Sequence, residues 1–113
     1  MISEELISEV LRLYPQYSNS DFCSGNIQIK QYSIHFEVNK SYMTQLNVYE
    51  FAHKCKKFAY DNGYILYSKP HKNNRGFCKI LKNKKRMYSE FSDNEINAII
   101  NCAQWILDNK DNQ

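Results

Sequence analysis

Apolar residues recur at helical spacing in three parts of the chain and at alternate positions in the segments between them. The first predicted helix begins after the N-cap residue Ser3 and ends before Pro15. The second runs from about Asn47 to Asn62, and the third follows Phe91. Their apolar stripes are Leu6, Ile7, Val10, Leu11 and Tyr14; Val48, Phe51, Ala52, Cys55, Phe58 and Ala59; and Ile96, Ile99, Ile100, Ala103, Ile106 and Leu107.

Two of these helices are predicted to begin with the same capping motif. Asn47 and Ser92 are expected N-caps, each followed three residues later by a glutamate that completes a capping box. Phe91 and Ile96 are placed to form a hydrophobic staple across the second cap. The Asn62-Gly63 pair is expected to end the second helix.

Alternating apolar residues predict the strands. Between residues 27 and 38 the alternation reverses at Lys30-Gln31, so one bent strand or two short strands are expected. Residues 39–45 are predicted to be a polar connection that carries Tyr42 and Met43, and residues 16–25 a loop anchored by Phe22 and Cys23. Further strands are predicted at 64–68, 77–82 and 86–91, with a loop at 69–76 and a turn at 83–85.

Short loops between neighbouring strands require antiparallel pairing. The sequence therefore predicts an α+β fold, an antiparallel sheet with helices packed on it, in the order α-β(-β)-α-β-β-β-α. With 113 residues and 42% hydrophobic content, the chain fits a single domain, residues 1–113, that ends in a polar tail at 108–113.

The formal net charge of +3 conceals an asymmetry. Residues 40–89 hold twelve Lys or Arg against Glu50 and Asp61, whereas both ends of the chain are acidic. A basic centre is typical of a nucleic-acid footprint, a surface for an acidic partner, or a solvated face. The candidate partner-binding residues are Lys69, His71, Lys72, Arg75, Lys82, Lys84, Lys85, Arg86 and Tyr88. Tyr67, Phe77 and Tyr88 are candidates for stacking on unpaired bases.

No residue pattern in the chain indicates catalysis, a cofactor or a metal ion. Cys55 and Cys102 lie on apolar helix stripes and are expected to be core residues, and Cys23 and Cys78 lack metal-ligand spacing. No histidine is paired with a cysteine in sequence, so a non-enzymatic protein is expected. Trp105 is expected in the core or at its boundary, or at an interface if it lies outside.

The first residues lack a basic region followed by a long apolar run, and no stretch approaches the length of a membrane span. We therefore expect a cytoplasmic protein without a signal peptide or a membrane anchor, whose cysteines are thiols. A monomer or a homodimer is compatible with this sequence.

Residues 46–107 follow the order α-β-β-β-α, with Lys69-Pro70-His71 in the first hairpin loop. This segment resembles the double-stranded RNA-binding domain, whose Gly-Pro-x-His type loop touches the minor groove. The resemblance implies that the Pro70-His71 loop contacts RNA. The family clamps phosphates with a Lys-Lys-x-Ala-Lys cluster at its last helix, where this chain has Ser92-Asp93-Asn94-Glu95, so that clamp is missing.

The helix, hairpin and final Ala-containing helix of residues 46–107 also resemble small phage and prophage accessory proteins of the αβα-sandwich type; compare Ala98, Ala103 and Trp105. This resemblance implies stoichiometric binding to a host protein or ribonucleoprotein, including inhibition of a bacterial defence system in the manner of anti-CRISPR proteins. The alternative hypothesis is a nucleic-acid-binding module that uses the basic hairpin region, residues 69–86.

Overall fold

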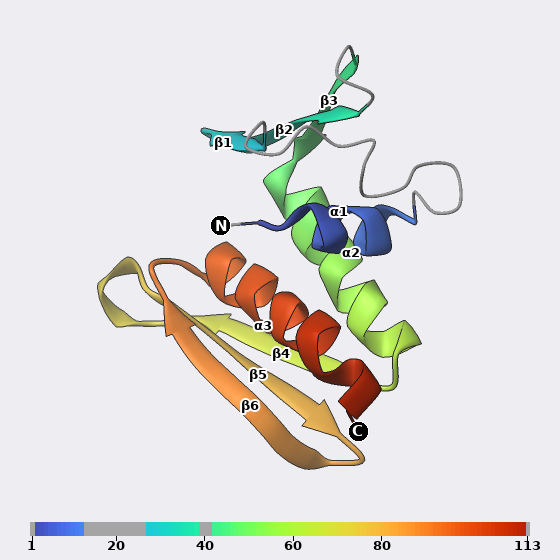
Figure 1. Cartoon of the computed structure of the whole chain (residues 1–113). Coiled ribbons are helices and arrows are strands. Elements are labelled where there is room, and N and C mark those ends of the chain that lie inside the picture. Colours follow the sequence, from blue (N-terminus) through green and yellow to red (C-terminus); the bar gives the residue numbers. More distant parts are fainter. Residues whose placement is uncertain (1, 13–26, 39–41, 113) are drawn as a thin grey trace. The chain divides into compact units, whose positions relative to one another are not determined.

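The computed structural model describes residues 2–12, 27–38 and 42–112. It confirms an α+β fold with the predicted order of elements, and its six strands form two three-stranded antiparallel sheets (Figure 1). The chain divides into two compact units, residues 1–54 and 55–113. The helices are α1 (Glu4–Leu11), α2 (Val48–Asp61) and α3 (Glu95–Asn109). The strands are β1 (Gln28–Lys30), β2 (Ser33–Val38), β3 (Tyr42–Asn47), β4 (Ile65–Pro70), β5 (Gly76–Lys82) and β6 (Lys85–Ser92).

Helix α1 begins as the sequence predicts and ends earlier. The Ser3 hydroxyl accepts a hydrogen bond from the Leu6 N–H (3.1 Å), which satisfies one of the free donors of the first turn. Arg12 adopts the left-handed conformation (φ 57°) and closes the helix three positions before Pro15. Tyr14, Pro15 and the predicted loop anchors Phe22 and Cys23 lie outside the described residues.

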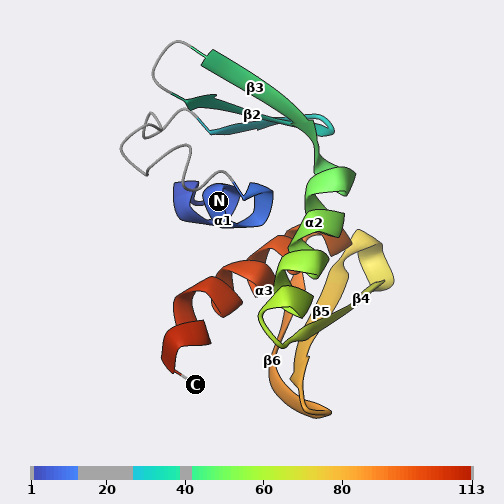
Figure 2. The same ribbon diagram turned by 90° about the vertical axis from the view of Figure 1, so that its right-hand side faces the viewer.

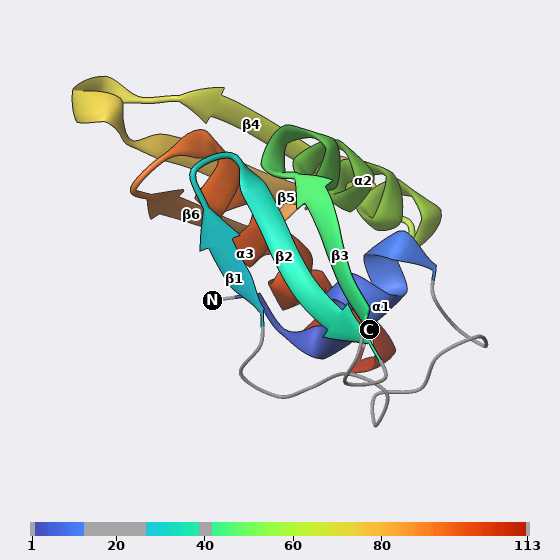
Figure 3. The ribbon, with the colours of Figure 1, turned by 90° about the horizontal axis from the view of Figure 1, so that it is seen from above.

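The first sheet has the order β1-β2-β3 (Figure 3). The reversal of alternation at Lys30-Gln31 is a tight turn between two short strands, and Gln31 has a positive φ of 53°. The prediction of a polar connection was wrong for residues 42–45, because β3 pairs with β2 from Tyr42 onward, and residues 39–41 lie outside the described residues. Residues 42–47 have only a weak apolar alternation of their own, so the pairing with β2 was not visible in the sequence.

Helix α2 has the two predicted ends. The side-chain oxygen of Asn47 accepts hydrogen bonds from the backbone N–H groups of Tyr49 (2.8 Å) and Glu50 (3.3 Å). At the other end Gly63 has a φ of 88°, and a pair of hydrogen bonds forms a Schellman motif. These bonds run from the Tyr64 N–H to the Ala59 carbonyl and from the Gly63 N–H to the Tyr60 carbonyl.

The second sheet has the order β4-β5-β6, and α3 lies along one of its faces (Figures 1 and 2). A 3₁₀ turn, η2 (Lys72–Asn74), connects β4 to β5. Asn83 and Lys84 (φ 54° and 67°) make the two-residue hairpin turn that leads to β6. A bulge opposite Ile80 and Leu81 shifts the register of β6 by one residue.

The start of α3 differs from the prediction. Its N-cap is Asn94, whose side-chain oxygen accepts a hydrogen bond from the Asn97 N–H (2.8 Å), whereas Ser92 is the last residue of β6. The Phe91–Ile96 staple was also wrong, because Phe91 is exposed on the sheet. The expected tail from residue 108 continues the helix to Asn109 and a 3₁₀ turn, η3 (Lys110–Asn112).

Most residues of the predicted helix stripes are buried, whereas Leu11, Ile96 and Leu107 are only half-buried. The buried residues of α3 are Ala98, Ile99, Ile100, Cys102, Ala103 and Ile106. Cys55 and Cys102 are fully buried, as expected of core cysteines, and Trp105 is half-buried. None of the helices in the described part of the chain is long and apolar enough to cross a membrane.

Candidate binding face

The second sheet has one face packed on α3 and one face that points away from it. Leu66, Cys78 and Ile80 are buried on the side of α3. Because side chains alternate along a strand, their neighbours point to the opposite side. We call this second side the open face. By register its members are Ile65, Tyr67 and Lys69 of β4, Phe77, Lys79 and Leu81 of β5, and Arg86, Ser89 and Phe91 of β6.

Aromatic rings are exposed on the open face. Tyr67 is 52% exposed and Phe91 48% exposed, and Phe77 lies directly opposite Phe91 with 4.9 Å between the ring centroids. His71 meets Phe91 edge to face, also at 4.9 Å. Large apolar side chains with this exposure, gathered on one sheet face, are typical of a binding surface.

A cation lies over each of these three aromatic rings. The Lys79 Nζ is 5.0 Å from the centroid of the Tyr67 ring, and the Lys69 Nζ is 5.8 Å from that of Phe77. The Arg75 guanidinium lies 5.8 Å from the centroid of Phe91. Exposed contacts of this kind contribute about 0.5–1 kcal/mol each. They therefore hold the cations near the rings but do not lock them there.

The open face carries no negative charge. The sequence has no Asp or Glu between Ile65 and Ser89. Glu90 belongs to the side of α3, where its carboxylate accepts hydrogen bonds from the Tyr88 hydroxyl (2.9 Å) and the Ser92 hydroxyl (2.9 Å). Among the described residues, no carboxylate forms an ion pair with Lys69, Arg75 or Lys79. The positive charges of this face are therefore available to a ligand.

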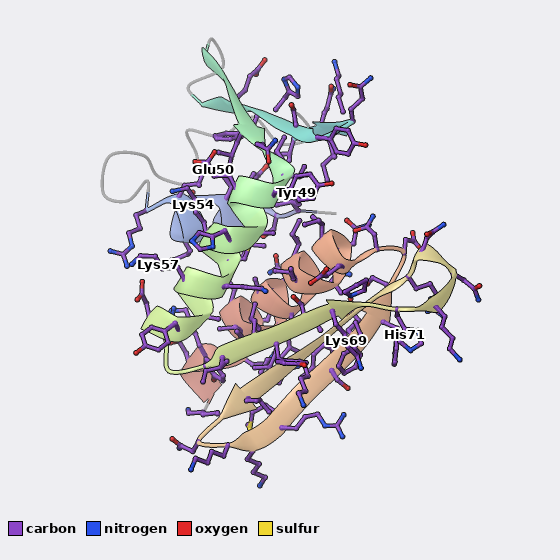
Figure 4. All side chains as sticks on the ribbon, turned by 180° about the vertical axis from the view of Figure 1, so that it is seen from behind. Tyr49, Glu50, Lys54, Lys57, Lys69 and His71 are labelled. Atoms are coloured by element: carbon purple, nitrogen blue, oxygen red, sulfur yellow. The ribbon has the colours of Figure 1, made fainter. Side chains whose placement is uncertain are left out.

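The structure separates the predicted partner-binding residues into two groups at opposite ends of the sheet. Lys69, His71, Lys72 and Arg75 lie at or next to the connection between β4 and β5; Lys69 and His71 are labelled in Figure 4. Lys82, Lys84, Lys85 and Arg86 lie at the β5–β6 turn. The length of β5 places these groups about 20 Å apart. Of the second group only Arg86 belongs to the open face, because Lys82 lies over the buried Tyr64 (5.1 Å) and Lys85 pairs with Lys82.

Tyr88 does not belong to the open face. Its ring stacks on that of Trp105 in α3 with 5.4 Å between centroids, and its hydroxyl donates to Glu90. That hydrogen bond is the main cause that raises the pKa of Tyr88, and burial of the side chain is the second cause. Tyr88 therefore packs the helix against the sheet, and Trp105 is a boundary residue with the same role.

Sequence reasoning missed Phe91 and did not select Lys79 as a site residue. Phe91 was assigned to the helix cap, although it alternates with Ser89 along β6 and so shares its face. Lys79 lies at the middle of the central strand, opposite Tyr67 on one side and Ser89 on the other. The alternation of Phe77, Lys79 and Leu81 in the sequence was the signal that could have identified it.

The loop that resembles the RNA-binding domain lies at the aromatic end of the open face. Lys69 and Pro70 are the last residues of β4, and the ring of His71 contacts Phe91. At the start of α3, Asn94 caps the helix, and Glu95 accepts a hydrogen bond from the Ser68 hydroxyl (2.7 Å) on the opposite side of the sheet. The acidic helix start thus has a structural role away from the open face.

The three described cysteines are buried free thiols. Burial, with a smaller effect of Cys78, raises the pKa of the Cys55 thiol. A hydrogen bond with Cys78, together with burial, raises the pKa of the Cys102 thiol. Both remain protonated at neutral pH, a state that is unsuited to nucleophilic attack or metal binding. Across the ranges that the structure describes, no group of three or more His, Cys, Asp or Glu is placed to hold a metal ion.

Comparison of the chain with protein families, with curated proteins and with solved structures gave no match.

Proposed function

We propose that this chain is a non-enzymatic protein that acts by stoichiometric binding, and that its binding surface is the open face of the β4–β5–β6 sheet. The observation that carries the proposal is the set of three cation–ring pairs on a face without any carboxylate. Such a face attracts a partner that offers negative charge and flat or apolar groups together. A host protein or ribonucleoprotein, the partner implied by the resemblance to phage accessory proteins, can offer both.

The chemistry of the remaining candidates supports binding over catalysis. The thiols of Cys55 and Cys102 are buried and held protonated, so neither offers a thiolate nucleophile. His71 packs against Phe91, with no carboxylate or thiol beside it among its contacts in the described chain. A general base needs a partner that orients it, and a nucleophile needs a base.

Affinity capture with matched charge reversals tests the proposal. The tagged protein is exposed to bacterial lysate, and the captured material is compared with that of two double variants. Lys69→Glu with Lys79→Glu changes the open face, whereas Lys84→Glu with Lys85→Glu changes the hairpin tip by the same charge. We expect the first variant to lose the captured partner and the second to keep it, at both low and moderate salt.

Circular dichroism and urea unfolding check that both variants remain folded. Equal retention of the partner by both variants would refute the open face as the binding surface. Loss through the tip variant alone would move the surface to the β5–β6 turn.

A further inference from the structure

We infer that the open face binds single-stranded nucleic acid, with bases stacked on Tyr67 and on the Phe77–Phe91 pair and with phosphates held by Lys69, Arg75 and Lys79. This inference rests on the proposed function, because it names the ligand class of the same face.

The aromatic rings of the open face are exposed and spaced along the sheet. Tyr67 and Phe91 expose about half of their surface, and Phe77 joins Phe91 into one aromatic platform. Tyr67 lies one strand over and two residues along from Phe77, so their Cα atoms are about 8 Å apart by strand geometry. Aromatic side chains spaced in this way on a sheet accept successive unpaired bases, whereas the bases of a duplex are already stacked within it.

The cations of the open face occupy the places that stacked bases would take. Lys69, Lys79 and Arg75 each lie over a ring that a base would cover. A cation–π contact at an exposed site is weaker than the stacking of a base on an aromatic ring, so a base displaces the cation. The long side chain keeps the displaced charge within reach of the phosphate that follows the base. The same three residues thus screen the rings in the free protein and bind the backbone in the complex.

The position of Lys79 favours nucleic acid over a protein partner. Lysine is depleted from the centre of protein–protein interfaces, because its strongly hydrated ammonium group is costly to bury there. Lys79 nevertheless lies at the middle of the central strand, between Tyr67 and Ser89. A second copy of this chain packed on the same face would bring like charges together. In a complex with a nucleic-acid strand, Lys79 instead pairs with a backbone phosphate, which stays exposed to solvent beside the stacked base.

The test compares oligonucleotides of equal length that differ in whether they carry bases and in whether their sugar is deoxyribose or ribose. The full chain is titrated with fluorescein-labelled oligothymidylate of roughly 16 nucleotides, with the oligouridylate of equal length, and with an abasic oligonucleotide carrying the same phosphates. We expect the wild-type protein to bind both base-bearing oligomers at least 10-fold more tightly than the abasic one. If the two base-bearing oligomers differ, the tighter one identifies RNA or DNA as the source of the ligand.

Ring variants supply the second readout. Tyr67→Leu and Phe91→Leu keep apolar bulk and remove the aromatic ring, and each should weaken oligothymidylate binding by roughly 5- to 150-fold. Their binding to the abasic oligonucleotide should be unchanged. The matched control is Tyr60→Leu, since Tyr60 is 73% exposed on α2 and lies outside the open face. It should bind every oligomer as the wild-type protein does.

The outcomes separate this inference from the proposed function. Equal affinity for the abasic and base-bearing oligomers, or ring variants that bind as well as Tyr60→Leu, would overturn base stacking while leaving a face that binds polyanions. No binding of any oligomer, with a nuclease-resistant protein still captured through Lys69 and Lys79, would overturn the nucleic-acid ligand and leave the proposed function intact. If the variant with Lys69→Glu and Lys79→Glu still bound both the oligonucleotide and the captured protein, the inference and the proposed function would both be refuted.

Discussion

Gly76 offers the sharpest test of how β5 meets α3. A methyl group added to Gly76 would lie 2.1 Å from the Glu95 nitrogen and 2.2 Å from the carbonyl carbon of Asn94. These are backbone atoms at the start of a helix, and the contact is about 1.3 Å short of ordinary van der Waals separation. Since no flexible side chain can yield, Gly76→Ala must move the strand away from the helix.

The cost of Gly76→Ala follows from what that movement breaks. Overpacking in a core commonly costs up to about 3 kcal/mol. The movement also disturbs the Asn94 cap, which contributes about 1 kcal/mol, and the hydrogen bond between Ser68 and Glu95, which contributes about as much. We therefore expect Gly76→Ala to lower the free energy of unfolding by about 3–5 kcal/mol, a large part of the stability of a small protein.

Urea unfolding followed by circular dichroism measures the effect, and Gly63→Ala is the matched control. Gly63 needs its positive φ of 88° but has nothing within 4 Å of an added methyl group. The control should therefore lose only about 1–2 kcal/mol, the cost of a left-handed alanine. If Gly76→Ala lost no more than Gly63→Ala, the close approach of β5 to the start of α3 would be wrong.

Two further predictions concern buried polar groups. The hydroxyl of Tyr64 is buried without a hydrogen-bond partner in the described chain. Tyr64→Phe should therefore leave the free energy of unfolding, measured in urea, unchanged or raise it by up to about 1 kcal/mol. A decrease of more than about 1 kcal/mol would show that the hydroxyl has a partner. The pKa values of Cys55 and Cys102 are raised above the ordinary 9.0 that they regain on unfolding, so the folded state holds their protons more tightly. Their contribution to stability should be complete below pH 9 and decline as pH rises above it, and a Cys55→Ala, Cys102→Ala variant should show a shallower decline between pH 9 and 10.5 than the wild-type protein.

The sequence was sufficient at the two ends of α2, where interactions between near neighbours determine the structure. The cap at Asn47 and the left-handed Gly63 depend on residues within one turn of each other, and both were predicted. The β5–β6 turn depends on Asn83 and Lys84 alone. Strand β3 was missed because its pairing with β2 defines it, and residues 42–47 have no local sequence signal as clear as a helix cap or a left-handed glycine.

The candidate site was only half visible for a related reason. Composition identified a basic segment, but a count of charges does not say which side of a sheet each side chain takes. The bulge opposite Ile80 and Leu81 changes that assignment within β6, placing Tyr88 on the side of α3 and Phe91 on the open face. A bulge adds one residue without altering composition, so the apolar pattern of residues 85–92 looked compatible with either side.

The same geometry argues that the positive charge of this chain is not a uniform solvated surface. A lysine-rich hairpin that serves only solubility needs its charges at the tip and along the edges, where Lys84 and Lys85 lie. Lys79 is at the centre of the sheet, paired with the ring of Tyr67, and an exposed aromatic–lysine pair there adds apolar surface to the solvent-facing side. Solubility alone does not require that combination, and it is the combination on which our proposal of a ligand that stacks and carries charge rests. The hairpin tip and the open face are therefore expected to differ in function although the sequence joins them in one basic run.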